Sequence, residues 1–322
     1  MNSTKTHATE TVTYTEGTFN GSNALKLFYR SWYPVSVDVA INNTDAALAS
    51  YTDAEVGIGK VKGVLALIHG LGEHSGRYCA VVRALTAAGY AIYAFDNQGH
   101  GRSEGQRGHI NRWQDYRDNT NAFLQLVRQQ EPTAPLFLMG HSLGGLIVLD
   151  YVLRSAQSPQ FQSFEIKGIL VSAPPMQPVG NATHSVRAVV ARLLSGLFPR
   201  FTLNMGLDQG CLSRDDTVIE QAEEDPLVHP YVTLRWGSET IATIDWVKAH
   251  MSQLSLPILL IHGGADPIID PAGSQAVFQQ IKLPEKTLCI YPDSYHEPHN
   301  DLDADRVTAD MVSWLDDRLS DL

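Results

Sequence analysis

The sequence GHSLG at residues 140–144 contains the residue best suited to nucleophilic chemistry, Ser142. An apolar run at 135–139 precedes it and a helix-compatible apolar run at 146–152 follows it, which places the serine on a sharp turn between a strand and a helix. The flanking glycines lack the Cβ atoms that would collide where the strand and the helix pass closely. Such a turn exposes the serine hydroxyl beside the free N–H groups of the helix start. We therefore expect Ser142 to be the nucleophile of an acyl-transfer reaction.

A serine hydroxyl needs a base that accepts its proton, and the base needs a carboxylate that orients it. In this strand–turn–helix context the carboxylate and then the histidine follow the serine along the chain. Asp266 lies on a glycine-containing loop after the apolar run 258–261, and His296 lies on the loop after the run 287–291. The three side chains would leave the carboxyl ends of strands in one sheet, where they can converge. The sequence predicts a catalytic triad of Ser142, His296 and Asp266.

Other histidines and carboxylates near these strand ends are alternatives. His299 is a second candidate for the base, and His296 is favoured because it follows its strand sooner. Asp270 precedes a helix at Pro271 and is expected to cap it, whereas Asp293 is too close in sequence to His296 to orient it and is expected in a turn. Structural roles are expected for three other strand-end histidines, His69, His141 and His262.

An oxyanion formed during acyl transfer needs two N–H donors. One is expected from Leu143, the residue after the nucleophile, and the other from the loop after the strand 64–68. That loop reads HGLGE at 69–73, and its two glycines leave the backbone at Leu71 free to point inward. A phosphate-binding loop is the alternative, but the loop lacks the G-K-[ST] ending and matches no G-x-G-x-x-G pattern.

The polar segment DNQGHGRS at 96–103 also follows a strand. We expect a hydrogen-bonded turn that shapes the floor of the site. A metal site formed by Asp96 and His100 is the less favoured alternative.

The elements that must position these residues alternate between buried strands and amphipathic helices. An antiparallel hairpin from strands at 11–14 and 25–32 is expected first. The later alternation predicts an α/β fold with an open, mostly parallel, doubly wound sheet. The expected strands are 64–68, 90–95, 135–139, 166–171, 258–261 and 287–291, and the expected helices are 77–88, 112–130, the segment after Ser142, 271–281 and 304–319.

Two segments interrupt this alternation. Residues 35–61 are expected to form an extended surface loop. Residues from about 174 to about 254 leave the carboxyl end of a strand, so we expect them on the ligand face of the sheet as a helical cap. The expected division is a core over 1–174, a cap over 175–250 and a second core part over 251–322. Apolar clusters at 193–198 and 201–205 are expected to pack the cap onto the core, and the alternative is that they line an acyl pocket or touch a lipid surface.

Composition excludes several other classes of protein. The chain of 322 residues has 43% hydrophobic residues, enough for a large core, and no apolar run near the ~18 residues that span a bilayer. A net charge of −11 argues against nucleic acid as a partner and against attachment to anionic lipid by charge alone. Residues 1–10 are expected to be disordered, and the polar N-terminal stretch does not resemble a signal peptide. The three cysteines are widely spaced and form no CxxC pair, so we expect neither a disulfide framework nor a zinc site. Because the N-terminal stretch does not resemble a signal peptide, we expect a cytoplasmic protein.

The chain resembles the monoacylglycerol lipase family of α/β-hydrolases, which belongs to the serine-aminopeptidase-like group. The matching stretches are HGLGEHSGRY (69–78), FDNQGHGRSEG (95–105), GHSLGG (140–145), SAPP (172–175), EDPLVHP (224–230), HGGADPIID (262–270) and YPDSYHEPHND (291–301). The resemblance implies the α/β-hydrolase fold and hydrolysis of a monoacyl ester of glycerol or a similar alcohol, with no metal or organic cofactor. It assigns the triad to Ser142, Asp266 and His296 and the oxyanion donors to Leu71 and Leu143. The cap matches only at EDPLVHP, and the segment 35–61 is longer than the family pattern.

The expected function is therefore ester hydrolysis through an acyl-enzyme, with a small ester or lipid as the substrate. A general carboxylesterase or a lysophospholipase is the main alternative. An aminopeptidase would need acidic groups for a free amine, which Glu223, Glu224 and Asp225 could supply, although we expect these three side chains to be solvated. A ligand receptor on a hydrolase scaffold is a further alternative.

Overall fold

The computed structural model describes residues 13–38, 55–179, 194–206 and 208–320 of the chain. The N-terminal residues expected to be disordered lie outside these ranges.

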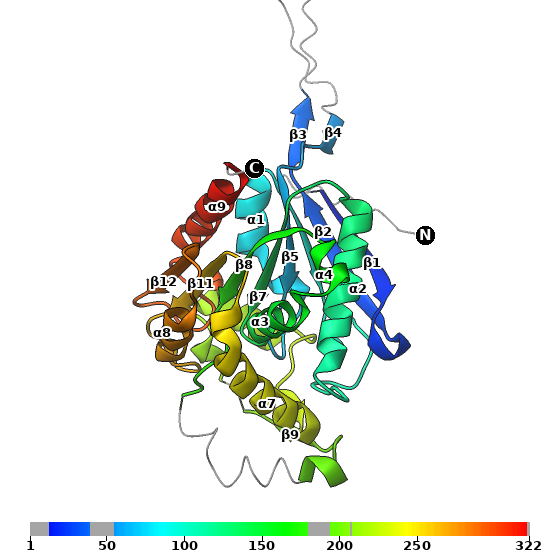
Figure 1. The fold of residues 1–322 in the computed structure, drawn as a ribbon, viewed down its shortest axis with the longest axis vertical. Helices are drawn as coiled ribbons and strands as arrows, with labels where there is room; N and C mark the ends of the chain where they lie inside the picture. Colours follow the sequence, from blue (N-terminus) through cyan, green and yellow to red (C-terminus); the bar gives the residue numbers. More distant parts are fainter. Residues whose placement is uncertain (1–12, 39–54, 180–193, 207, 321–322) are drawn as a thin grey trace, which may run out of the picture.

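A sheet of eight strands, in the order β1-β2-β6-β5-β7-β8-β11-β12, forms the centre of the structure (Figure 1). The β1–β2 and β2–β6 pairs are antiparallel and all other pairs are parallel. Every residue of β5, β6, β7 and β11 is buried, as expected for parallel strands that are covered on both faces. The strands of this sheet are β1 (Thr13–Asn20), β2 (Lys26–Tyr33), β5 (Gly63–Ile68), β6 (Tyr90–Phe95), β7 (Leu136–His141), β8 (Ile166–Ser172), β11 (Ile258–Gly263) and β12 (Lys286–Tyr291).

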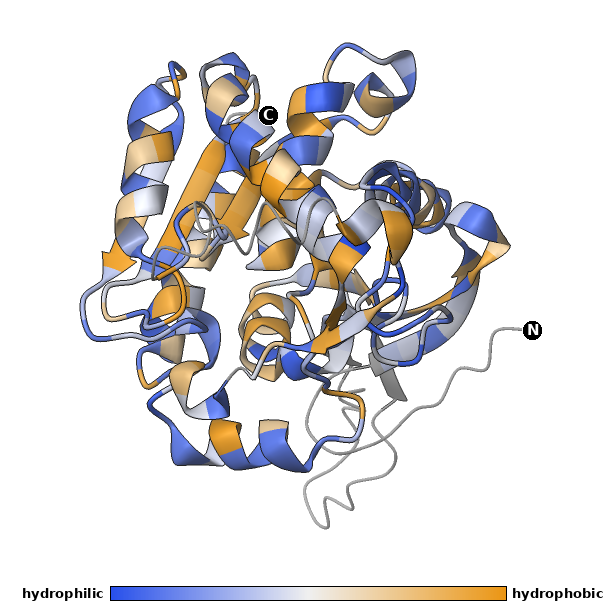
Figure 2. Ribbon diagram, turned by 90° about the horizontal axis from the view of Figure 1, so that it is seen from below, coloured by the Kyte–Doolittle hydropathy of each residue, from blue (hydrophilic) through white to orange (hydrophobic). Residues whose placement is uncertain are grey.

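Helices cover both faces of the sheet, and alternate residues of each strand face the two layers. On β5, Leu65 and Leu67 belong to the cluster formed with α1 and α9, which lie side by side, whereas Ala66 and Ile68 belong to the cluster formed with α2, α3 and α8 (Figure 1). Hydrophobic residues are concentrated in the strands and on the inward sides of the helices (Figure 2). The helices of the core are α1 (Cys79–Ala87), α2 (Gln114–Gln130), α3 (Leu143–Ser155), α4 (Pro159–Gln162), α8 (Pro271–Gln280) and α9 (Ala304–Ser320).

The expected α/β architecture is confirmed, and so is the opening hairpin, which extends from Thr13 in the described residues. The expectation of a loop over 35–61 is wrong at both of its ends. There β3 (Val35–Asp38) pairs antiparallel with β4 (Glu55–Ile58), and the resulting ribbon projects from the body (Figure 1). Alternating valine and isoleucine residues at these ends favour strands, although the polar residues between them dominate the composition.

Residues 173–257, between β8 and β11, are called the insertion below. Its described elements include the antiparallel pair β9 (Thr202–Asn204) and β10 (Tyr231–Thr233), and helices α6 (Asp216–Glu224) and α7 (Leu234–His250). The 17-residue helix α7 was not recognised in the sequence. Threonines at 240 and 243 belong to its buried side, so its apolar periodicity is weak.

The apolar clusters of the insertion are exposed in the structure. Leu197 is 75% exposed, and Phe198 and Phe201 are each 59% exposed. The expectation that these clusters pack the insertion onto the core is therefore wrong for the described residues. In the ranges that the structure describes, no helix is both long enough and apolar enough to cross a bilayer.

Close packing between α3 and the end of β5 makes Gly144 intolerant of any side chain. A Cβ atom added there would lie 2.0 Å from the carbonyl oxygen of Ile68 and 2.7 Å from that of His69, and both obstacles are backbone atoms. We expect Gly144→Ala to lower the free energy of unfolding by more than about 3 kcal/mol in urea denaturation.

Gly237 provides the matched control, because it also lies in a helix but has open space around an added Cβ. Gly237→Ala should raise the free energy of unfolding by up to about 1 kcal/mol. Equal effects of the two substitutions would contradict the packing described for Gly144.

Candidate active site

Ser142 occupies a strained turn between β7, which ends at His141, and α3, which begins at Leu143. Its backbone angles are φ 50° and ψ −116°, a conformation that residues other than glycine rarely adopt. The turn is held by a hydrogen bond from Ser142 N–H to Ser172 O, 2.8 Å, on the neighbouring strand β8. A Cβ atom at Gly140 would lie 2.2 Å from Gly144 O, so the turn requires glycine there. The serine hydroxyl is thereby presented at the carboxyl edge of the sheet.

The structure brings the three predicted residues into one hydrogen-bonded line. The Ser142 Oγ atom lies 3.0 Å from His296 Nε2, and His296 Nδ1 lies 2.7 Å from Asp266 Oδ2. With the Nδ1 proton donated to Asp266, Nε2 is free to accept the serine proton. His296 is 5% exposed and Asp266 is 6% exposed, so the contact between them is shielded from water.

Asp266 is fixed by three further donors. Its Oδ1 accepts the N–H groups of Ile268 (2.8 Å) and Ile269 (3.0 Å), and its Oδ2 also accepts a hydrogen bond from Nε2 of His262 at 3.1 Å. Burial would raise the pKa of the Asp266 carboxyl, but the charge of His296 and these hydrogen bonds hold the pKa well below its usual range. The carboxylate is thus ionised at every pH at which the protein is expected to work. Ser274 contacts Nδ1 of His262 at 2.7 Å, so this histidine has the structural role expected for it.

Burial lowers the pKa of His296, but the Asp266 carboxylate more than offsets this effect, and the pKa is raised above its ordinary value. A base must be neutral to accept a proton, so activity should be lost as the pH falls through that pKa. We expect kcat/KM to rise with pH with a midpoint above the ordinary histidine value of about 6.5. Initial rates with an uncharged ester between pH 5 and pH 9 measure this midpoint. A midpoint below about 6 would contradict the pairing of His296 with Asp266.

The two expected oxyanion donors face the same space. Leu71 and Leu143 both line the cavity that contains Ser142, and Leu143 is the first residue of α3, where helical N–H groups have no partner within the helix. Neither N–H donates a hydrogen bond to any group within the described ranges. Glu73 holds the loop that carries Leu71, because its Oε1 accepts the N–H of Gly70 at 2.6 Å and the hydroxyl of Tyr78 at 2.8 Å.

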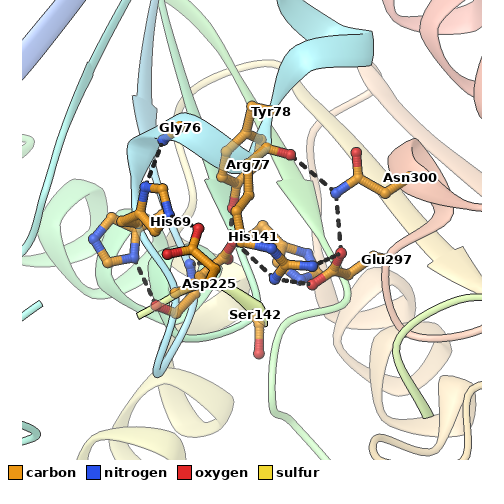
Figure 3. Close-up of polar contacts among 12 residues, drawn as sticks. His69, Gly76, Arg77, Tyr78, His141, Ser142, Asp225, Glu297 and Asn300 are labelled. Carbon is orange, nitrogen blue, oxygen red and sulfur yellow. Dashed lines mark hydrogen bonds and ion pairs between the residues drawn. The ribbon is translucent and has the colours of Figure 1, made fainter. Parts of the chain in front are cut away.

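A buried charged cluster lies beside the nucleophile and was not identified from the sequence. The guanidinium of Arg77 lies 2.8 Å from Glu297 Oε1 and 3.5 Å from Glu73 Oε2, and Asn300 donates to Glu297 at 2.9 Å (Figure 3). Burial, followed by repulsion from Glu297, raises the pKa of Glu73 to about 7. The pKa of Glu297 is instead lowered, because Arg77 outweighs the effect of burial. In the sequence, only their positions within the motifs at 69–78 and 291–301 could have indicated that these charged residues have a role in the site.

A cavity of about 320 Å³ contains Ser142 and His296 in its wall. Residues of both the core and the insertion form its walls, and most of the wall surface is apolar. The apolar lining residues are Leu71, Leu143, Pro175, Pro178, Val179, Met205, Leu212, Val228, Pro230, Trp236, Ile268 and Ile269.

The weaker candidates have other surroundings. Asp270 accepts the N–H of Ala272 and caps α8, as expected, and Asp293 lies in an exposed turn. The ring of His299 is buried and stacked 5.0 Å from that of Tyr78, and within the described ranges neither of its ring nitrogens forms a hydrogen bond, to Ser142 or to any other group. Asp96 accepts hydrogen bonds from Ser75 and from the backbone of Arg102, which agrees with the expected polar turn.

Three acidic residues of the insertion were expected to be solvated. Glu223 and Glu224 are exposed, as expected. Asp225 is instead half-buried, and its Oδ2 atom lies 2.8 Å from Nε2 of His74.

Comparison with known proteins identifies the family. Residues 59–303 match the family described as serine aminopeptidase S33. The chain belongs to this family. Its α/β-hydrolase fold agrees with the resemblance seen in the sequence motifs.

Several proteins similar to this chain are lipases. The chain is 29% identical over 305 residues to the monoacylglycerol lipase of Mycolicibacterium smegmatis, covering 94% of this chain and 97% of that protein. It is 31% identical to the crystal structure of the Paleococcus ferrophilus monoacylglycerol lipase, with a TM-score of 0.70, covering 81% of this chain and 96% of that chain. An uncharacterized abhydrolase domain-containing protein of Dictyostelium discoideum is 31% identical over 265 residues, but those cover 81% of this chain and only 27% of that longer protein.

Proposed function

We propose that this protein is a serine hydrolase that cleaves monoacylglycerols to a fatty acid and glycerol through an acyl-enzyme on Ser142. The observation that carries the proposal is the hydrogen-bonded line Ser142–His296–Asp266 in the wall of an apolar cavity. The similarity to monoacylglycerol lipases over nearly the whole chain supports the choice of substrate.

In the proposed mechanism, His296 accepts the hydroxyl proton as Ser142 Oγ attacks the ester carbonyl. The N–H groups of Leu71 and Leu143 stabilise the oxyanion, while Asp266 stabilises the imidazolium. The tetrahedral intermediate then expels the alcohol, which takes the proton from His296. A water molecule, deprotonated by the same histidine, attacks the acyl-enzyme and releases the fatty acid. Ser142 regains its proton, so the protein is unchanged after each cycle.

The residues that line the cavity favour a lipid over a peptide. Its apolar walls match an acyl chain, which loses contact with water on binding. An aminopeptidase needs an unpaired acidic group to bind a free amine, but Glu223, Glu224 and Asp225 do not line the cavity. Glu73 and Glu297 do line it, and both lie against Arg77. A general carboxylesterase or a lysophospholipase has the same triad chemistry and is the alternative.

We further propose that the insertion acts as a cap and that its exposed apolar patch contacts lipid surfaces. The patch consists of Leu194, Leu197, Phe198, Phe201, Leu203 and Met205. Exposed apolar residues in such a group are characteristic of a surface that binds apolar partners. Because the chain has a net charge of −11, the contact would be apolar rather than electrostatic. A double substitution of Phe198 and Phe201 by serine should reduce sedimentation with phosphatidylcholine vesicles, and equal sedimentation of both forms would contradict this role.

A cytoplasmic location is also proposed. Cys79, Cys211 and Cys289 are free thiols, which fits a reducing compartment.

Pre-steady-state hydrolysis of p-nitrophenyl butyrate tests the acyl-enzyme. We expect a burst of about one equivalent of p-nitrophenol per enzyme, followed by steady turnover and a mass shift located on Ser142. Release that stops after the first equivalent would favour a ligand receptor, and release without labelling of Ser142 would contradict the proposed nucleophile.

A further inference from the structure

The loop that carries His296 has little secondary structure of its own. Residues 292–303, the histidine loop, connect β12 to α9 and contain only one short helical turn, Pro298–Asn300. Two carboxylates within the loop hold the residues just before His296. Asp301 Oδ2 accepts the N–H of Tyr295 at 2.6 Å, and Asp303 Oδ2 accepts the hydroxyl of Ser294 at 2.7 Å. The position of the histidine therefore depends on where these two carboxylates are held.

Both carboxylates are held by one residue of the insertion. Arg214 Nε donates to Asp301 Oδ1 at 2.9 Å, and the Nη2 atom of the same guanidinium donates to Asp303 Oδ2 at 2.6 Å. The Asp301 side chain is fully buried, whereas that of Asp303 is about one-third exposed. A planar guanidinium can bridge two carboxylates in a fixed geometry, which a lysine ammonium cannot reproduce.

Residues 212–214 form further contacts with the same loop. The N–H of Glu297 donates to Leu212 O at 2.8 Å, and the hydroxyl of Ser213 donates to Asn300 O at 3.0 Å. Leu212 also lines the cavity that contains Ser142. This short stretch thus joins the cavity wall formed by the insertion to the loop that carries the proposed base.

We propose that Arg214 is a positioning residue, which holds the histidine loop so that His296 stays within hydrogen-bond distance of both Ser142 and Asp266. The inference rests on the proposed function, because it assigns the task of the base to His296. Two distances of 2.7 and 3.0 Å must be kept at once, and a misplacement of about 1 Å in such a geometry can reduce turnover by about 100-fold. Arg214 touches neither the nucleophile nor the base, so it acts through Asp301 and Asp303.

Arg214→Gln tests the proposal. It removes the charge that holds Asp301 and Asp303, so the histidine loop should relax. We expect kcat for p-nitrophenyl butyrate to fall about 10- to 100-fold with KM changed by less than about twofold. The acidic midpoint of kcat/KM should also move to lower pH, because a looser His296–Asp266 contact stabilises the imidazolium less. Among the described residues, the charged and titratable groups around His296 are Asp266, Glu297, Glu73, His141 and His299, and the substitution leaves all five in place.

Arg154→Gln is the matched control. Arg154 binds a fully buried carboxylate, Asp150, at 2.7 Å, and its guanidinium lies over the ring of Trp246 in the insertion. It therefore also links the core to the insertion, but it has no contact with the histidine loop. Both variants should lower Tm, whereas only Arg214→Gln should change kcat and the acidic midpoint. A folded Arg214→Gln enzyme with unchanged kcat and midpoint would overturn the proposal.

If Arg214→Gln does not fold, Asp303→Asn decides the question, because it weakens the more exposed arm of the bridge, together with the bond from Ser294, and leaves the bond between Arg214 and Asp301 in place. We then expect a fall in kcat of about three- to tenfold without a change in KM, and unchanged kcat would overturn the role of Arg214. The unmodified protein separates this result from the proposed function. If it hydrolyses the ester and Ser142→Ala does not, the proposed mechanism stands whatever the Arg214 variant shows.

Discussion

Replacing Ser142 by alanine should lower kcat for ester hydrolysis by about 10⁶-fold while leaving substrate binding nearly unchanged. The variant lacks the hydroxyl oxygen that forms the acyl-enzyme, and no other hydroxyl lies within hydrogen-bond distance of His296 Nε2 among the described residues. The apolar cavity walls, which would bind the acyl chain, are not altered. The measurement is steady-state hydrolysis of p-nitrophenyl butyrate by the variant and the unmodified protein, together with the affinity of the variant for the product fatty acid.

The backbone of Ser142 supplies a second readout from the same position. Alanine must keep the strained angles of φ 50° and ψ −116°, whereas glycine adopts them with less strain. We expect Ser142→Gly to be more stable than Ser142→Ala by about 1 kcal/mol, with both inactive. A Ser142→Ala protein that retains more than about one-thousandth of the activity would contradict the nucleophile assignment.

Asp266→Asn should reduce kcat by about 10⁴-fold. The carboxylate oxygen that accepts the Nδ1 proton of His296 at 2.7 Å also accepts a hydrogen bond from His262 at 3.1 Å. An asparagine amide that donates to Nδ1 would leave the proton of His296 on Nε2, where it faces Ser142 and blocks proton transfer. The measurement is kcat for the same ester near the pH optimum.

Asp270→Ala is the control for Asp266→Asn, because Asp270 lies four residues away and caps α8 without contacting His296. Asp270→Ala should lower the free energy of unfolding by about 1 kcal/mol and leave kcat within about twofold of that of the unmodified protein. A loss of activity smaller than about tenfold in Asp266→Asn would show that another group orients the histidine.

Strand ends explain why much of the site could be predicted from the sequence. Ser142, Asp266 and His296 each follow an apolar run, and parallel strands bring their carboxyl ends to the same edge of the sheet. Leu71 follows another such strand, so the oxyanion loop could be predicted in the same way. The fold class follows from the same alternation of strands and helices.

The parts that could not be predicted depend on contacts between distant residues. Arg77 and Glu297 are 220 positions apart, and no local pattern indicates that they form a buried ion pair. Arg214 and Asp301 are likewise joined only by the way the insertion folds back on the core. The apolar residues at Leu197, Phe198 and Phe201 were expected to be buried, because apolar composition by itself does not show which surface a side chain faces.

The most direct test of the proposed function is the rate of fatty acid release from 1-monoacylglycerols with chains from C4 to C18, compared with p-nitrophenyl esters of the same acids. Ser142→Ala serves as the control for background hydrolysis. We predict that kcat/KM rises with chain length and is highest for medium or long monoacylglycerols, because the apolar walls of the cavity gain contact with each added methylene. Activity confined to the C4 esters would contradict a monoacylglycerol lipase and would leave a general carboxylesterase with the same triad.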